Sequence, residues 1–178
     1  MKKKFLLFTI FICSILTINC SKESSEVIDY NRKFNSNSGG TLINAMSGEP
    51  SNLIAMIAGD SASSVIAGNI FNSLIKYDEN LDYAPELAES WEISNNQKTI
   101  TFKLKKGLKW QDGQPLTSSD VLFTWKLITD PKTRTPYAAD YQLVKKALTP
   151  DPLTFKITYA DSYAPALDTW ASLHILPK

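Results

Sequence analysis

Residues 84–125 decide the fold of this chain and read APELAESWEISNNQKTITFKLKKGLKWQDGQPLTSSDVLFTW. Between Thr99 and Leu104 apolar and polar residues alternate strictly, which is typical of a strand with one buried face. The preceding Asn95-Asn96 favours a turn, because asparagine tolerates left-handed backbone and bonds its own main chain. The pattern therefore predicts a β-hairpin from Trp91–Ser94 and Thr99–Leu104.

A helix is predicted directly after this hairpin. Asp112-Gly113 indicates a second turn, and Thr117 is a typical N-cap residue. Asp120 stands three residues later, where it completes an Asp version of the capping box and favours the helix N-terminus. One face of the helix is apolar: Val121, Leu122, Trp125 and Ile128. We expect Trp91 and Trp125 to pack in the core, and Trp110 to be structural.

The same stretch resembles the extracellular solute-binding proteins of family 5, which serve bacterial peptide and nickel ABC transporters. That family has a P-x-L-A-x-S-W segment followed by T-x-T-F-x-L-R-x-G-V-K-W-x-D-G-x-P-L-T-A-x-D-V. Here the two segments stand in the same order, at Pro85–Trp91 and Thr99–Val121. The resemblance extends in less detail over residues 40–178.

The resemblance implies a mixed α/β periplasmic-binding-protein fold of class II, here incomplete because family members are more than twice as long. It implies that residues 41–77 begin the first lobe and that residues 78–159 form an inserted small, β-rich domain. Residues 160–178 would return toward the first lobe. The chain is thus interpreted as the N-terminal part of a binding protein.

The remaining elements are predicted from local patterns. Residues 41–46 favour a strand. Asp60 or Ser61 is expected to cap a helix over Ala62–Leu74, with one buried apolar face formed by Val65, Ile66, Ile70 and Leu74. A short strand is expected over Leu74–Tyr77. A second hairpin is predicted, with Val144, Lys146 and Leu148 on one face of its first strand and Phe155, Ile157 and Tyr159 on one face of its second. A short helix is predicted over Tyr163–Leu173, with Ala164, Leu167, Trp170 and Ala171 inward.

The N-terminus predicts export. Residues 1–20 are interpreted as a lipoprotein signal peptide, in which three lysines precede the apolar run Phe5–Ile18. Thr17-Ile18-Asn19-Cys20 resembles a lipobox, although Thr17 and Asn19 depart from its usual residues. We expect Cys20 to carry the lipid; an ordinary signal peptide cut elsewhere is the alternative. Residues 21–40 are polar and predict a flexible tether.

Composition and motifs exclude several classes of function. The formal net charge of +1 gives no argument for nucleic-acid binding. His174 is the single histidine, so no zinc ligand set is expected, and the seven glycines form no phosphate-binding run. We therefore expect no cofactor, no metal and no catalytic residues. If the chain is cut before Cys20, that residue is its one cysteine and no disulfide can form within the chain.

The resemblance also implies ligand contacts. In oligopeptide-binding relatives the loop before the first long helix offers backbone groups to the ligand, and that loop matches Gly59, Asp60 and Ser61. A tyrosine in the relatives' Ser-Pro-Tyr-Ala segment matches Tyr137. Main-chain hydrogen bonds suit extended peptides of varied sequence. An exposed loop aromatic is the alternative reading of Tyr137, and Leu53-Ile54-Ala55 departs from the Leu-Asp-Pro of many relatives.

The expected function is capture of oligopeptides outside the cytoplasm, as a monomer, for ABC permease subunits. The membrane would be reached through the lipid anchor, facing the periplasm or cell exterior. A nickel or oligosaccharide binder of the same family is an alternative. An exported structural lipoprotein and, more remotely, a secreted hydrolase are alternatives of other classes.

Overall fold

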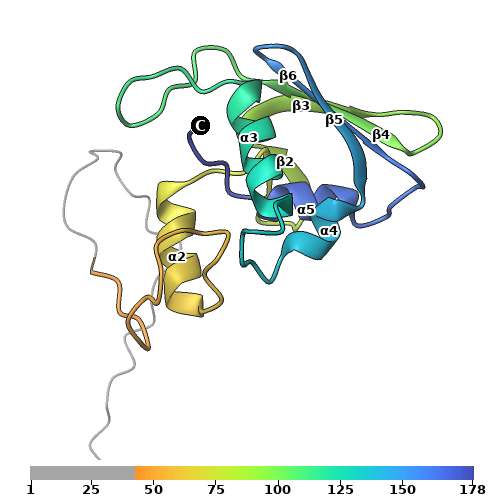
Figure 1. Cartoon of the computed structure of the whole chain (residues 1–178). Helices are drawn as coiled ribbons and strands as arrows, with labels where there is room; N and C mark the ends of the chain where they lie inside the picture. The colour runs from red at the N-terminus through yellow and green to blue at the C-terminus, as the bar shows by residue number, and fades with distance from the viewer. Residues whose placement is uncertain (1–42) are drawn as a thin grey trace, which may run out of the picture. The chain divides into compact units, whose positions relative to one another are not determined.

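The computed structural model describes residues 43–178, which form a mixed α/β structure (Figure 1). In chain order the elements are α2 (Ser61–Ile70), β1 (Ile75–Tyr77), β2 (Tyr83–Pro85), β3 (Ala88–Ile93), β4 (Thr99–Leu104), α3 (Ser118–Thr129), α4 (Ala138–Gln142), β5 (Val144–Asp151), β6 (Thr154–Tyr159) and α5 (Ala166–Ser172). Among these residues no helix has the length and apolar character needed to span a membrane.

A four-stranded antiparallel sheet in the order β3-β4-β6-β5 carries most of the architecture. Both predicted hairpins are confirmed, as β3–β4 and β5–β6. The two hairpins join through β4 and β6, where Phe102 lies opposite Phe155 and Ile100 opposite Ile157. Cross-strand apolar pairs of this kind fix the register, because a slip of one residue would expose all of them. A separate two-stranded sheet pairs β1 with β2.

The apolar face of the four-stranded sheet packs on Trp170, which α5 supplies. The indole is fully buried, and its ring centroid lies 5.2 Å from that of Phe155 and 6.0 Å from that of Phe102. Its Nε1 donates a hydrogen bond to the hydroxyl of Tyr159 at 3.0 Å, so the buried donor is satisfied. Trp170 therefore joins the last helix to the two central strands in one core.

The capping box predicted at Thr117 is confirmed. The Thr117 side chain accepts from the backbone of α3's first turn, and Asp120 Oδ2 accepts from the Thr117 backbone N–H at 2.8 Å. Val121 and Ile128 are buried, whereas Leu122 and Trp125 are partly buried against the same core. The predicted helix face is thus correct, with Trp125 at its margin.

The predicted face of β5 is wrong beyond Val144. A register shift between Val144 and Lys146 places Ala147 against the core and leaves Lys146 and Leu148 exposed. A bulge inserts one extra residue and so exchanges the two faces of the strand that follows. The faces predicted for β4 and β6 are confirmed, because Ile100, Phe102, Leu104, Phe155, Ile157 and Tyr159 are all buried.

Three predictions near the chain's ends are corrected. The helix expected to reach Leu74 ends at Ile70, and its buried residues are Ala62, Ser63 and Ala67, while Val65 and Ile70 are exposed. Ala62 and Ala67 are small and allow close packing on the buried side of this helix, whereas Val65 and Ile70 lie on its exposed side. The described part of the predicted first strand, residues 43–46, is not a strand and has no pairing partner among residues 43–178. The helix predicted over Tyr163–Leu173 begins only at Ala166, after Pro165, and Ala164 is exposed.

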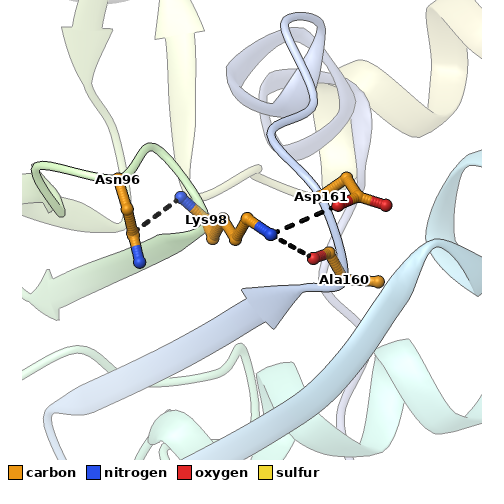
Figure 2. A network of polar contacts seen from close by, with 4 residues as sticks. All are labelled: Asn96, Lys98, Ala160 and Asp161. Atoms are coloured by element: carbon orange, nitrogen blue, oxygen red, sulfur yellow. Dashed lines mark hydrogen bonds and ion pairs between the residues drawn. The ribbon is translucent and has the colours of Figure 1, made fainter.

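A polar network ties the β3–β4 turn to the end of β6 (Figure 2). Lys98 Nζ donates to the backbone oxygen of Ala160 at 2.7 Å and forms an ion pair with Asp161 at 3.2 Å. Asn96 Oδ1 accepts from the Lys98 backbone N–H at 3.2 Å. Because the Asp161 side chain is 94% exposed, the ion pair itself contributes little to stability.

Residues 175–176, near the end of the chain, lie beside the segment that connects α2 to β1 and beside α3. The backbone N–H of Ile175 donates to Asn72 O at 2.9 Å, and that of Leu176 donates to the buried Thr124 hydroxyl at 2.9 Å. Leu173, Ile175 and Leu176 are buried in the same core as the sheet. Segments 78–159 and 160–178 thus share one core, and the division into an inserted domain and a returning segment stays a prediction.

Candidate ligand-binding site

The loop before α2 is ordered by the carboxylate of Asp60, which is the helix N-cap. The carboxylate accepts hydrogen bonds from the Ser63 backbone N–H at 2.8 Å and from the Ser63 hydroxyl at 2.7 Å. It also accepts one from the Ser51 hydroxyl. Hydrogen bonds from Ser51, and then from Ser63, hold the pKa of Asp60 well below its ordinary value, because they stabilise the charged form. Asp60 therefore fixes the loop's conformation through its side chain.

Tyr137 lies against this loop, although the two are far apart in the sequence. Its hydroxyl donates to Ala58 O at 3.0 Å across 79 positions of the chain. The hydroxyl of Thr135 donates to Met56 O in the same way. The structure thus brings the segment of Tyr137 to the segment immediately before Gly59–Ser61, and its tyrosine side chain remains 43% exposed.

Gly59 presents an open stretch of backbone. A Cβ placed there would meet no heavy atom within 4 Å, and its φ lies outside the left-handed region that favours glycine. Among the described residues, no hydrogen bond uses the Gly59 N–H or C=O. Nothing within residues 43–178 therefore explains a glycine at this position. Ser61, the first residue of α2, is also exposed.

A cavity of about 230 Å³ adjoins Tyr137. Its walls come from the loop before α2 together with α2 itself, from Ile128 of α3, from Tyr137 and Tyr141, and from residues 172–174. His174 is part of this wall, and burial lowers its pKa below the ordinary value of 6.5. From the sequence, His174 was expected only not to belong to a zinc ligand set, and nothing indicated the cavity, because its walls come from four separated segments.

Two further predictions concern other residues. Cys20, the expected lipidation site, lies outside the described residues. Within residues 43–178, no three His, Cys, Asp or Glu side chains are grouped so that they could hold a metal ion.

Residues 82–178 match the family model of the bacterial extracellular solute-binding proteins, family 5, middle region. The oligopeptide-binding protein AppA of Bacillus subtilis is 33% identical over 144 residues, which are 79% of this chain and 26% of AppA. The periplasmic oligopeptide-binding protein OppA of Haemophilus influenzae is 40% identical over 74 residues, which are 42% of this chain and 14% of OppA.

Solved structures agree with these matches. The binding protein AgaA of A. tumefacien R10, in complex with agropinic acid, has a TM-score of 0.69 and 32% identity over 73% of this chain and 27% of its own. H. influenzae OppA, in complex with the peptide RPPGFSPFR, has a TM-score of 0.67 and 30% identity over 72% of this chain and 29% of its own. The chain thus spans well under a third of each of these relatives. The predicted binding-protein fold is confirmed, and the chain belongs to the bacterial extracellular solute-binding proteins of family 5.

Proposed function

We propose that this chain is part of the substrate-binding protein of a peptide-type ABC importer. It would capture oligopeptides outside the cytoplasm and deliver them to the permease without covalent chemistry. The observation that carries this proposal is the contact of Tyr137 with Ala58, beside Gly59–Ser61, in a chain that belongs to family 5. Two relatives, AppA and OppA, are named as oligopeptide-binding proteins.

The open backbone at Gly59 supports a peptide ligand. An extended peptide binds largely through main-chain N–H and C=O groups, which must be free on the protein side. The Gly59 backbone groups meet this condition in the described residues, and the absence of a side chain lets a second backbone approach closely. Tyr137 adds an apolar ring with a polar end beside them. Gly59, Asp60, Ser61 and Tyr137 would then form one wall of the ligand cleft, with Asp60 acting through the loop.

Other ligands are known within the family. One solved relative holds agropinic acid and another holds Ni(L-His). Those ligands belong to those proteins. For this chain the two peptide-binding relatives and the free main-chain groups favour a peptide.

The proposal includes export, anchoring and partners. Cys20 would carry the lipid and hold a monomer at the cell membrane or outer membrane, facing the periplasm or cell exterior. Closure of two lobes around the ligand would then present it to the permease. Relatives of this family are periplasmic by name, as in OppA of H. influenzae.

Calorimetric titration of the chain with a mixed tri- to pentapeptide library tests the proposed wall. A pocket buries most of its ligand between walls on both sides. We therefore expect this one wall to bind peptides with a dissociation constant above the micromolar range. Tyr137→Ala should weaken that binding further, whereas Tyr163→Ala, whose ring lines a different pocket, should not. Micromolar binding that is lost in Tyr137→Ala would contradict the need for a second wall. Binding unaffected by Tyr137→Ala would contradict its role as a ligand contact.

A further inference from the structure

The hydroxyl groups that line the cavity beside Tyr137 can accept hydrogen bonds from a ligand but have no proton left to donate. Each of its four hydroxyls donates its proton to a backbone oxygen. The Tyr137 hydroxyl donates to Ala58 O at 3.0 Å and the Tyr141 hydroxyl to Thr169 O at 2.9 Å. The hydroxyls of Ser64 and Ser172 likewise donate to backbone oxygens of Asp60, at 3.0 Å, and Asp168, at 2.9 Å. What these four groups have left are oxygen lone pairs, which only accept hydrogen bonds.

His174 is the remaining polar side chain of the cavity. In the part of the chain that the structure describes, neither ring nitrogen of His174 takes part in a hydrogen bond. Neither nitrogen is fully buried, in contrast to Trp110 Nε1, which is buried without a hydrogen-bond partner. Because burial keeps the imidazole neutral at pH 7, it offers one donor and one acceptor. Glu86 is the charged group of residues 43–178 that acts on the imidazole, and none of the Lys, Arg, Asp or Glu side chains in that range lines the cavity.

This set of groups discriminates between ligands. A carboxylate in the cavity would face several acceptor oxygens with no cation, which is costly away from water. A neutral group that donates hydrogen bonds could donate to these hydroxyl oxygens. Its aliphatic part would pack against the apolar side chains of Met56, Ile128 and Leu173. The volume of about 230 Å³ suits one side chain and excludes a whole peptide.

We propose that this cavity is a side-chain subsite for a neutral, hydrogen-bond-donating group of the ligand, such as a glutamine side chain, and that His174 sets its preference against carboxylates. This inference rests on the proposed function, because Tyr137 belongs both to the proposed ligand wall and to the cavity. The subsite would select between ligand side chains. The backbone groups of the loop before α2 do not, because they bind only the main chain of a peptide.

Tripeptides that differ only in glutamine or glutamate give a matched test, because the two side chains have the same shape. Ala-Gln-Ala, Gln-Ala-Ala and Ala-Ala-Gln, each with its glutamate counterpart, are titrated into the full chain and followed by NMR. The imidazole C–H signals of His174 need no assignment, since it is the single histidine. We expect at least one glutamine peptide to shift these signals at pH 7 and to bind roughly tenfold more tightly than its glutamate counterpart.

The pH dependence provides an independent readout. As the pH falls through the pKa of His174, the imidazolium gains a second donor and a positive charge, so the preference for glutamine should shrink. Tyr141 remains protonated over this range, because burial raises the pKa of its hydroxyl. His174→Gln keeps one donor and one acceptor and should retain the preference while losing its pH dependence. His174→Lys, which places a cation there, should reverse it.

The outcomes separate the subsite from the proposed function. Equal affinity for both peptides, or an unmoved imidazole while the amide signals of Gly59 and Tyr137 shift, would overturn the subsite and leave the ligand wall intact. If neither the imidazole nor the wall responds at saturating peptide, both fail. A preference for glutamine that survives His174→Lys would show that His174 does not set it.

Discussion

At the scale of single residues, Trp170 and Trp125 both belong to the core but differ in burial and in the partner of the indole N–H. Trp170 is fully buried, packs on three aromatic rings and satisfies its indole N–H through Tyr159. Trp125 is only partly buried and donates its indole N–H to Tyr141 O at 3.1 Å. The 3.6-residue pattern predicted that Trp125 faces the core, but periodicity gives the direction of a side chain and not its depth.

These environments predict different costs of truncation. Trp170→Ala should lower the free energy of unfolding by about 3–5 kcal/mol, as for other large buried aromatics. Trp125→Ala should cost less, about 1–3 kcal/mol, because part of its ring stays in water. Urea unfolding of both variants at pH 7 measures the difference, provided that the m-values match the wild type. A larger loss in Trp125→Ala would contradict the assignment of Trp170 as the centre of the core.

At the scale of secondary-structure elements, the start of α3 was predicted from the sequence, whereas the buried faces of β5 and α2 were not. Thr117 and Asp120 specify the start of α3 by hydrogen bonds within four residues, so the sequence alone was sufficient. The face of β5 depends on a bulge at its pairing with β6, and the buried side of α2 depends on which segments pack there. Those are tertiary contacts, and they have no local signal in the sequence.

The N-cap of α2 predicts a pH dependence. The pKa of Asp60 is lower in the folded chain than its ordinary value of 3.8, so its contribution to stability is present above that value and is lost as the pH falls below it. Asp60→Asn keeps a capping side chain without a titrating carboxyl. The wild type should therefore lose stability relative to Asp60→Asn as the pH is lowered from 5 to 2.

Urea unfolding at several pH values, followed through this range, measures that difference. Asp112→Asn is a suitable control, because Asp112 is an exposed turn residue outside α2. A stability difference between wild type and Asp60→Asn that stays constant with pH would show that the Asp60 carboxylate is not stabilised by the fold.

At the scale of the whole molecule, the candidate site depends on segments that only the fold brings together. The family resemblance pointed to Gly59–Ser61 and Tyr137 separately, and in the structure the Tyr137 hydroxyl donates to the backbone oxygen of Ala58, the residue before Gly59. The cavity with His174 was not predictable, since no spacing in the sequence relates residues 56, 64, 137 and 174. The proposed side-chain specificity of the site could therefore not be predicted from the sequence.

The proposed anchoring is a prediction about the chain outside the described residues. If Cys20 is lipidated, metabolic labelling with a fatty-acid analogue should mark the protein, and the protein should partition into detergent. Cys20→Ala should abolish both, because stable anchoring needs the acyl chains that this residue would carry. Cys13→Ala, within the predicted signal peptide, should leave both unchanged. Labelling that persists in Cys20→Ala would contradict the assigned lipidation site.

We propose that Gly59–Ser61 and Tyr137 form one ligand-binding wall. Backbone amide spectra of the ¹⁵N-labelled chain, recorded during titration with mixed tri- to pentapeptides, test it most directly because they also detect weak binding. We expect the largest signal changes at Gly59, Ser61 and Tyr137, and we expect Gly59→Val to reduce them without loss of the folded spectrum. Changes concentrated elsewhere, such as on the β5–β6 hairpin, with the signals of residues 59–61 unmoved, would contradict it.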